Sequence, residues 1–435
     1  MTLEKNTNAR FSDLDIAPKL LAVLDQLHFV KPTPIQHQAI PVILTGKDIV
    51  GIAQTGTGKT LAFGVPMIQR LAQYYGQGLI LVPTRELALQ VDEVLQKIGR
   101  AFGLRTVVVI GGASAGLQIK ALSKNPHIVI ATPGRLVDHL QQKRYSLNKV
   151  KIIVLDEADR MFDIGFMPQI KQVLSAAPRE RQTMLFSATM PQAIAEIAAR
   201  HMKLPLRIEV APAGTAAANV EQEVFIINKN DKMRLLDKIL TENHGTFLVF
   251  SRTKFGAKRI AANLYRMGYT ATEIHSNRTL SQRKAAMDGF KSGKYRVLVA
   301  TDIAARGIDV SNISFVINYD LPDDSGDYVH RIGRTGRADS LGKAISFATP
   351  EQRSDIKHIE KLIRKTIPIL SLPTLPPHRT PMAPVQARKE YVEKNNFQKK
   401  NRKAGQGVYF FPKRRQSGSN SRRFANRKPA RQSNW

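Results

Sequence analysis

Two stretches of the 435-residue sequence place groups that bind phosphate and a divalent cation directly after apolar segments. The first is GIAQTGTGKT at residues 51–60, which lies between the strand-like DIVGIA and the helix-like LAFGVPMIQRLA. A glycine-rich turn between a strand and a helix is the context of a phosphate-binding loop. Gly56 and Gly58 would let backbone N–H groups surround phosphate oxygens at the positive end of the helix. Lys59 is predicted to reach the β- and γ-phosphates of a nucleotide, and the Thr60 hydroxyl to ligate Mg²⁺.

This loop departs from the usual pattern, because Ala53 stands where the first glycine is expected. The competing interpretation is a glycine-rich turn that binds nothing. The strand–turn–helix context and a second motif favour the phosphate site.

The second motif is IIVLDEADRM at residues 152–161, where four apolar residues lead into Asp156, Glu157 and Asp159. A carboxylate at the end of a buried strand can hold Mg²⁺ opposite Thr60, and this role is predicted for Asp156. Glu157 would then orient and deprotonate the attacking water. The alternative is a helix cap followed by a solvated charge cluster. That alternative explains Asp159, but it accounts poorly for two adjacent acids ending an apolar strand.

Short apolar runs alternate with helical patterns from about residue 40 to residue 350. Val/Ile/Leu-rich strands separated by helices indicate α/β domains whose parallel sheets are covered by helices on both faces. Residues 211–220 contain few large apolar side chains and are predicted to be a linker. The predicted organisation is therefore a leading region at 1–37, a first domain at 38–210, the linker, and a second domain at 221–375.

The composition points to a polyanionic partner, with nucleic acid favoured over membrane. The chain has 66 Lys and Arg against 35 Asp and Glu, a formal net charge of +31, and no Cys. No run of about 18 apolar residues could span a bilayer, and the opening MTLEKNTNARFSDLD lacks the apolar core of a secretory signal. We therefore expect a cytoplasmic protein with no membrane partner.

Residues 376–435 carry 16 Lys and Arg against two Glu, so this segment holds +14 of the net charge. It is rich in Asn, Gln, Ser, Gly and Pro, and we predict a disordered basic tail. Its scattered aromatic residues suit single-strand binding through charge and stacking. A solubilising extension with only non-specific affinity is the alternative.

The letters DEAD at 156–159, together with AQTGTGKT at 53–60, resemble the DEAD-box RNA helicases of superfamily 2, and most closely the bacterial RhlE type. The match runs from Phe11 to about residue 350 and implies two tandem RecA-like domains. The P-loops of this family accept Ala at the first position. HFVKPTPIQ at 28–36 resembles the Q motif, in which Gln36 would read the adenine edge and Phe29 would pack on the base. His28 stands where the family usually has Gly.

The resemblance implies a nucleotide site, an RNA-facing surface and a coupling segment. PTRELA at 83–88, GG at 111–112 and TPGR at 132–135 match RNA-facing motifs, SAT at 187–189 matches the coupling motif, and TDIAARGID at 301–309 and HRIGRTGR at 330–337 match the last motifs. For ATP it implies Phe29, Gln36, Ala53, Gln54, Thr55, Gly56, Thr57, Gly58, Lys59, Thr60, Gly307 and Asp309, the last on the ribose, with Arg334 and Arg337 as arginine fingers. For RNA it implies Pro83, Thr84, Arg85, Gly112, Thr132, Pro133, Gly134, Arg135, Arg252, Arg283 and Thr301, and for coupling Asp159, Ser187, Thr189 and His330. The QxxR motif falls at Leu280–Arg283, where its Gln is absent.

Arg334 and Arg337 belong to a different predicted domain from Lys59 and Glu157. Hydrolysis should therefore be slow until the domains close, and RNA that favours closure should stimulate it. The predicted function is an ATP-dependent RNA helicase that unwinds short duplexes with little sequence specificity. An ATP-gated RNA clamp or annealing chaperone needs the same motifs and is the alternative function, whereas a DNA translocase is disfavoured. Two roles stay open for Arg331, an arginine finger or a local salt bridge. Ribosome-assembly or RNA-decay proteins are the predicted partners.

Overall fold

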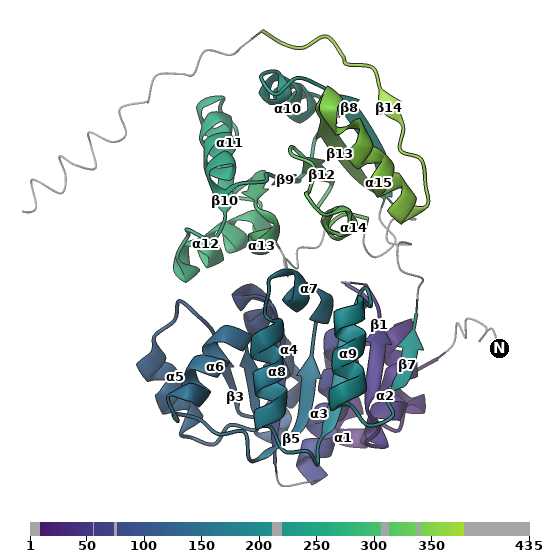
Figure 1. The fold of residues 1–435 in the computed structure, drawn as a ribbon, viewed down its shortest axis with the longest axis vertical. Helices are drawn as coiled ribbons and strands as arrows, with labels where there is room; N and C mark the ends of the chain where they lie inside the picture. The colour runs from purple at the N-terminus through teal and green to yellow at the C-terminus, as the bar shows by residue number, and fades with distance from the viewer. Residues whose placement is uncertain are drawn as a thin grey trace, which may run out of the picture. The chain divides into compact units, whose positions relative to one another are not determined.

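The computed structural model describes residues 9–54, 56–73, 76–210, 220–305, 313–336 and 341–377. Two seven-stranded sheets account for most of this chain, and every strand pair within them is parallel. The predicted α/β fold class, with helix-covered parallel sheets, is confirmed. Residues 9–210 form the first lobe and residues 220–377 form the second lobe (Figure 1).

The sheet of the first lobe has the strand order β3-β4-β2-β5-β6-β1-β7. Its strands are β1 (Ile49–Ile52), β2 (Gln77–Leu81), β3 (Thr106–Val109), β4 (Ile128–Ala131), β5 (Val150–Leu155), β6 (Gln182–Ser187) and β7 (Leu206–Glu209). Its helices are η1 (Phe11–Asp13), α1 (Pro18–Gln26), α2 (Pro34–Leu44), α3 (Lys59–Gln73), α4 (Arg85–Gly99), η2 (Arg100–Phe102), α5 (Ala115–Leu122), α6 (Pro133–Gln141), α7 (Ala158–Asp163), α8 (Met167–Ala176) and α9 (Gln192–His201).

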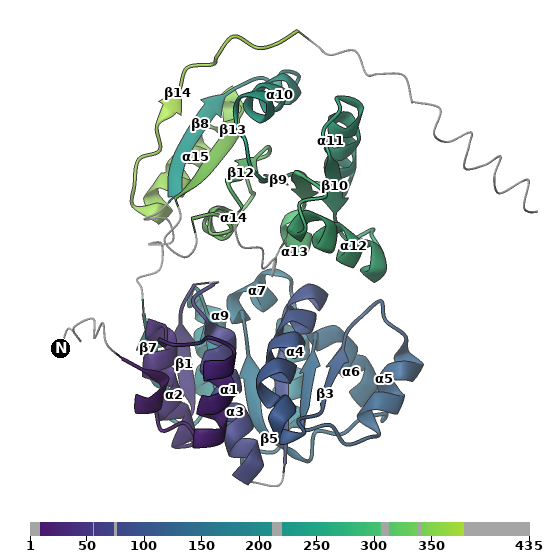
Figure 2. The same ribbon diagram turned by 180° about the vertical axis from the view of Figure 1, so that it is seen from behind.

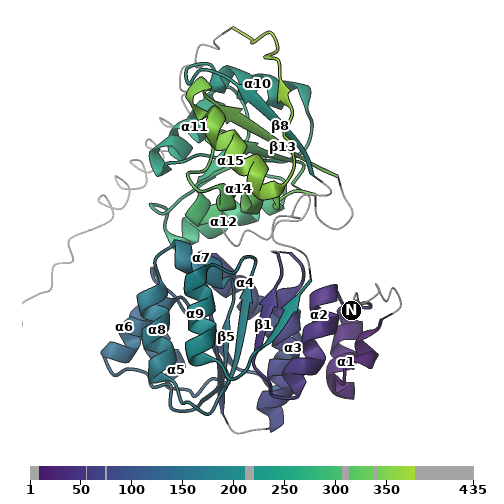
Figure 3. The same ribbon diagram turned by 45° about the vertical axis from the view of Figure 1, so that its right-hand side comes forward.

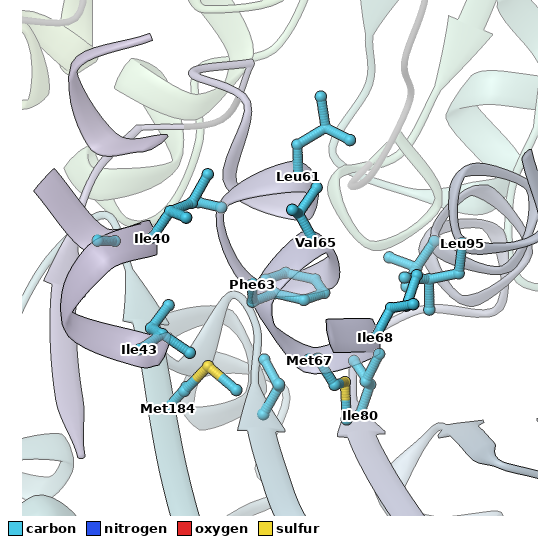
Figure 4. Packing of buried hydrophobic residues seen from close by; sticks show 14 of the residues in the cluster. Ile40, Ile43, Leu61, Phe63, Val65, Met67, Ile68, Ile80, Leu95 and Met184 are labelled. Atoms are coloured by element: carbon cyan, nitrogen blue, oxygen red, sulfur yellow. The ribbon is translucent and has the colours of Figure 1, made fainter. Parts of the chain in front are cut away.

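Two apolar clusters bury the two faces of this sheet. Helices α1 to α4 pack on one face, and α6 to α9 pack on the other, together with Leu122 at the end of α5. Opposite views show these two helical layers (Figures 1 and 2). In the first cluster, Phe63 and Val65 of α3 lie among Ile40 of α2 and Met184 of β6 (Figure 4). The central strands are buried on both faces, which explains why they read as continuous apolar runs rather than alternating ones.

The second lobe repeats this architecture with the strand order β10-β11-β9-β12-β13-β8-β14. Its strands are β8 (Val220–Ile226), β9 (Phe247–Phe250), β10 (Ala271–Ile274), β11 (Val297–Ala300), β12 (Phe315–Asn318), β13 (Gly342–Ala348) and β14 (Ile369–Leu370). Its helices are α10 (Lys232–Glu242), α11 (Lys254–Arg266), α12 (Leu280–Lys291), α13 (Asp302–Ala305), α14 (Ser325–Ile332), η3 (Pro350–Gln352) and α15 (Arg353–Ile363). Helices α10 and α11 cover one face, while α12, α14 and α15 cover the other, where α14 and α15 lie together (Figure 3).

The structure differs from the sequence prediction at the start of β8 and in two edge strands. Strand β8 begins at Val220, the last residue of the predicted linker, because that side chain is buried against β13. The edge strands β10 and β14 were not predicted, since each is short and neither is a continuous apolar run. The rest of the linker and all but the first two residues of the predicted tail lie outside the described residues. No helix in the described ranges combines the length and the apolarity needed to cross a membrane.

Candidate nucleotide and nucleic-acid site

Apart from Phe29 and Gln36, which precede β1, the predicted site residues of the first lobe follow the carboxyl ends of its strands. Because the strands are parallel, these ends share one edge of the sheet, where ligands of open α/β sheets bind. The loops after β5, β6 and β1, which are neighbours, carry the residues predicted for nucleotide chemistry and coupling. The loops after β3, β4 and β2, also neighbours, carry the residues predicted to face RNA. One edge is therefore divided into two adjoining halves.

The phosphate-binding loop leaves β1 and enters α3 at Lys59, as predicted. Gly56 and Gly58 have φ values of 85° and 87°, a left-handed conformation that non-glycine residues rarely adopt. The buried Lys59 ammonium donates a hydrogen bond of 2.9 Å to the Ala53 carbonyl, which closes the loop on itself. A lysine ammonium has three donors, so this contact leaves two for other acceptors.

The Q-motif glutamine is fixed against this loop. Gln36 Nε2 donates to the Gly58 carbonyl at 3.0 Å, and Gln36 Oε1 accepts from the Thr33 N–H at 2.9 Å. A Cβ at Gly58 would lie 2.3 Å from Gln36 Nε2, so glycine is also required here by close packing. The Gln36 amide keeps one donor and one acceptor position, the pair that a purine edge would use.

Asp156 and Glu157 form a buried turn at the end of β5. The Asp156 N–H donates to the Leu81 carbonyl at 3.0 Å, and Asp156 Oδ1 accepts from the Glu157 N–H at 3.0 Å. Burial raises the pKa of Asp156 to about 6, against the opposing effect of the nearby Lys59 charge. Glu157 has a φ of 53°, an uncommon left-handed conformation for a residue with a side chain.

Arg160, one turn further along α7, was not singled out in the sequence. Its Nε lies 3.8 Å from Glu157 Oε2, and both side chains are buried. Glu157 Oε2 accepts no hydrogen bond within the described chain. A buried carboxylate oxygen without a donor is a costly arrangement, and it leaves the group available to accept one from a ligand or water.

Asp159 joins the loops after β5 and β6, and Ser187 extends this connection to the phosphate loop. Its Oδ2 accepts hydrogen bonds from the Ala188 N–H at 3.0 Å and from the Thr189 N–H and hydroxyl at 2.8 and 3.0 Å. The Asp159 N–H donates to the Ser187 hydroxyl at 3.1 Å, while the Ser187 carbonyl accepts from the Ala53 N–H at 2.9 Å. Asp159 is thus a buried connection between the loops after β5 and β6 rather than a member of a solvated charge cluster.

The residues predicted to face RNA begin helices at the other half of the edge. Thr84 caps α4 by accepting from the Leu87 N–H at 3.2 Å, and Pro83 precedes it. Pro133 is the first residue of α6, directly after the buried Thr132, and Gly134 and Arg135 follow in its first turn.

Arg85 lies against the glycine pair after β3. A Cβ on Gly112 would come within 2.3 Å of Arg85 Nη1, and one on Gly111 within 3.3 Å of Arg85 Nη2. The two glycines therefore make room for the guanidinium, which explains their placement opposite PTRELA.

In the second lobe, the contacts of Arg331 favour the interpretation as a local salt bridge. This buried guanidinium makes a bidentate ion pair with Asp302 at 2.6 and 2.7 Å, and it donates hydrogen bonds to the Asn318 side chain and the Asp320 carbonyl. It also lies over the ring of Phe250, 4.9 Å from the centroid. Arg331 is therefore a local structural residue that links α13 and α14 to the carboxyl end of β12.

Other predicted residues of the second lobe also follow strand ends. His330 and the buried Arg334 lie within and directly after α14. Arg252 follows β9, and its N–H donates to Asp320 Oδ2 at 3.1 Å. Thr301 follows β11, and the buried Arg283 lies in the first turn of α12. Thr55, Gly307, Asp309 and Arg337 lie outside the described residues, so their assignments stay predictions.

Asp320 and Lys232 were missed in the sequence. Lys232 Nζ donates to Asp320 Oδ1 at 3.2 Å and to the Tyr319 carbonyl at 2.7 Å, while Ser251 and Arg252 donate to Asp320 Oδ2. The only signal in the sequence is that Asp320 ends an apolar run, as Asp156 does.

The donors at the first-lobe edge suit Mg²⁺ bound together with a nucleotide. The described residues contain no cluster of three or more carboxylates or histidines that could hold a metal by itself. Mg²⁺ usually takes one or two protein carboxylates, with phosphate oxygens and water supplying the remaining ligands. Asp156 and Thr60 fit that requirement, whereas a site built from protein ligands alone would not form here.

Comparisons with known proteins agree with this geometry. Residues 33–197 match the family model described as DEAD/DEAH box helicase, and residues 231–339 match the helicase conserved C-terminal domain. The chain is 42% identical over 368 residues to the DEAD-box ATP-dependent RNA helicase CshA of Bacillus subtilis, covering 84% of this chain and 74% of that protein. It is 41% identical over 406 residues to the ATP-dependent rRNA helicase RRP3 of Debaryomyces hansenii, covering 90% and 84%.

Among solved structures, the chain resembles Saccharomyces cerevisiae Dbp5 bound to RNA and ADP BeF3. The identity is 30% and the TM-score is 0.74, with 89% of this chain and 99% of Dbp5 covered.

Removing the Asp159 carboxylate should loosen the loop after β6. In Asp159→Ala, the N–H groups of Ala188 and Thr189 and the Thr189 hydroxyl lose their acceptor, so we expect a loss of about 2 to 4 kcal/mol in unfolding free energy. Chemical denaturation measures this loss, and hydrogen exchange at Ala188 and Thr189 should quicken. The control is Asp138→Ala, whose side chain is 59% exposed and whose removal should cost under about 0.5 kcal/mol. Equal stability of the two variants would contradict the role of Asp159.

Proposed function

The chain belongs to the DEAD-box family of ATP-dependent RNA helicases, and on that premise we propose how its residues divide the work of RNA-stimulated ATP hydrolysis and local RNA unwinding. The main support for this proposal is that three features meet at neighbouring strand ends. They are the phosphate loop after β1, the carboxylate pair after β5 and the Ser187–Asp159 connection after β6.

We assign ATP binding to the loop from Ala53 to Thr60 and to the Q motif. Lys59, at the start of α3, would exchange its bond to the Ala53 carbonyl for bonds to phosphate oxygens. Gln36 and Phe29 would hold the base, Gln36 through its remaining donor and acceptor. Phe29 is 37% exposed, which leaves ring surface for stacking. By resemblance, Gly307 and Asp309 complete the nucleotide contacts.

Thr60 and Asp156 would hold Mg²⁺, which when bound neutralises charge on the phosphates. Glu157 would take the proton of the attacking water through its buried Oε2, which accepts no hydrogen bond within the described residues. Arg160 would help to orient Glu157 toward that water, because its Nε lies 3.8 Å from Glu157 Oε2.

Arg334 and Arg337 are proposed as the arginine fingers, brought to the phosphates when the two lobes close around ATP and RNA. Arg331 is not proposed as a finger, because its guanidinium is engaged by Asp302, Asn318 and the Asp320 carbonyl. The Asp302–Arg331 pair instead holds α14, which carries His330 and leads into Arg334. RNA would couple to this step through the first-lobe loops and through Arg252, Arg283 and Thr301.

The RNA-facing residues offer cations, hydroxyls and helix N-termini, which recognise phosphate and not base edges. We therefore propose RNA contact with little sequence preference. No observation favours the alternative function, an annealing chaperone or an ATP-gated RNA clamp.

We propose a cytoplasmic protein of the RhlE type that acts in ribosome assembly or RNA decay. The likeness to an rRNA helicase supports the first pathway. Sequencing RNA crosslinked to the protein in cells tests this assignment, and recovery of ribosomal precursors above other RNAs would support it.

We further propose that the basic tail is a tethered RNA-binding arm. Its +14 charge and its aromatic residues suit a single strand, and tethering would raise the local RNA concentration near the lobes.

Glu157→Gln should separate hydrolysis from binding. The amide keeps the shape of the carboxylate but cannot accept a proton, so we expect kcat for RNA-stimulated ATP hydrolysis to fall about 100-fold or more. ATP affinity should stay within about threefold. Glu196→Gln makes the same chemical change on the exposed face of α9 and should leave hydrolysis unchanged. The variant also tests the clamp: a clamp would keep its RNA activity, whereas a helicase that needs turnover fails after one round of strand displacement.

Mg²⁺-dependent ATP binding should weaken as the pH falls through about 6. The pKa of Asp156 is raised to about 6 by burial, and Mg²⁺ requires the carboxylate form. The raised pKa also means that Asp156 adds to folding stability at low pH and loses this contribution as the pH rises through about 6. Between pH 7 and pH 5 we expect about a tenfold loss of the Mg²⁺-dependent part of ATP affinity.

Titration by fluorescent nucleotide, with and without Mg²⁺, measures this loss. Asp156→Asn is the control, because it keeps the titration of the nucleotide itself and removes that of the side chain. A pH dependence that is the same in the variant and the parent would contradict the assignment.

Removing the tail should weaken RNA coupling without altering the chemistry. Truncation after Pro377 is the sharpest design, because Arg234 donates to the carbonyls of Leu375 and Pro376 and those contacts are kept. We expect a higher RNA concentration for half-maximal ATPase activity and an unchanged maximal rate. If the half-maximal concentration stays the same in low salt, the tail is only a solubilising extension.

A further inference from the structure

A groove runs across the β3 edge of the first lobe, away from the nucleotide and RNA-facing loops. Within the described chain, β3 is the outermost strand of its sheet and pairs only with β4. Helix α4 packs on one face of that sheet, and Leu122 at the end of α5 packs on the other. The groove has a volume of about 920 Å³ and is lined from α4, from residues 103–107 and from α5. The surrounding elements can be followed in Figure 2.

The floor of this β3-edge groove is apolar. Leu104, Val107, Leu117, Ala121 and Pro126 contribute to its lining. Leu117 is 70% exposed, which is unusual for a leucine on a helix that also supplies a buried residue to the core. An exposed apolar surface in a hollow indicates a contact surface more often than an isolated exposed side chain does.

The rim is strongly basic. Lys97, Arg100, Arg105, Lys120 and Lys124 line the groove and are exposed, and Glu93 is the single carboxylate among its lining residues. Glu93 is paired with Lys97 at 2.8 Å, so the other four cations are not balanced by a carboxylate of the groove. The rim would therefore attract an acidic partner.

The backbone of β3 offers a hydrogen-bonding edge to that partner. The Arg105 carbonyl accepts from the N–H groups of His127 and Ile128, and the Val109 carbonyl accepts from the Thr132 N–H. In a parallel strand, alternate residues bond to the same neighbour, so Arg105, Val107 and Val109 face β4. The N–H and C=O groups of Thr106 and Val108 therefore point away from the sheet, where an added strand would bond to them.

We propose that the β3-edge groove binds an extended acidic segment of a partner protein, which adds a strand beside β3. Its backbone bonds to Thr106 and Val108, its alternate apolar side chains cover Leu117 and Val107, and its carboxylates meet Arg100, Arg105, Lys120 and Lys124. A single-stranded RNA is less well suited, because the lining has no aromatic side chain on which a base could stack. The groove lies at the amino-terminal end of β3 and leaves the carboxyl edge open for nucleotide and RNA.

The test uses the full-length protein and a fluorescein-labelled ten-residue peptide in which five Glu and five Val residues alternate. Fluorescence anisotropy should show saturable binding, and hydrogen exchange should slow at the Thr106 and Val108 amides. A peptide with the same ten residues sorted into a Glu block and a Val block should bind more weakly, since its apolar residues no longer alternate. This comparison corrects for simple charge attraction to the basic tail.

Two sets of surface variants locate the contact. Lys120→Glu with Lys124→Glu should weaken binding of the alternating peptide at least tenfold, and Leu117→Ser should weaken it about threefold. The matched control, Lys357→Glu with Lys361→Glu, makes the same charge change on the exposed face of α15 and should leave affinity unchanged. RNA-stimulated ATPase activity should be unchanged in all of these variants, so the result does not depend on the roles proposed for the nucleotide site.

Three outcomes would overturn the proposal. One is that the alternating and the sorted peptide bind with equal affinity. Another is that the α15 control variant loses as much peptide affinity as the Lys120→Glu, Lys124→Glu variant. The third is protection of Thr106 and Val108 by a 12-nucleotide oligouridylate that also displaces the peptide, which would assign the groove to RNA.

Discussion

The carboxylate of Asp159 is the contact on which the first-lobe site depends. Three loops must meet at the carboxyl edge of one sheet, and loops are the parts of a fold that packing controls least. Asp159 fixes the loop after β6 by accepting two backbone N–H groups and a hydroxyl, and its own N–H bonds to the last residue of β6. That residue, Ser187, also binds the entry of the phosphate loop through its carbonyl. The phosphate loop is therefore joined to the SAT segment by one hydrogen bond, from the Ala53 N–H to the Ser187 carbonyl.

The second lobe has a comparable carboxylate connection, although its sequence motifs differ. Asp320 collects Lys232, Ser251 and the Arg252 N–H, while Asp302 holds Arg331. Both acids follow strand ends, as Asp156 and Asp159 do in the first lobe. In each lobe, acids at strand ends hold the loops that carry the proposed functional residues, and in the second lobe they do so partly through the Asp320–Lys232 and Asp302–Arg331 ion pairs.

Much of this organisation could be predicted from the sequence, because it depends on local patterns. Continuous apolar runs gave the central strands, and the strand–glycine turn–helix pattern gave the phosphate loop. The sequence could not distinguish a solvated Asp159 from a buried one, since its partners Ala188 and Thr189 in the loop after β6 are 29 and 30 residues further along the chain. Arg331 illustrates the same limit, because its partner Asp302 is distant in sequence. His28 replaces the family's glycine but still adopts the left-handed φ of 60°, a conformation that histidine tolerates better than most residues.

The packing of Arg85 against Gly112 has a consequence for how this surface could diverge. A side chain at position 112 would have no room beside the guanidinium, so any replacement must push the positive charge to a new place while leaving the arginine intact. A substitution at position 112 would thus change where the Arg85 charge lies, and with it the affinity for a polyanion, without removing any charged group.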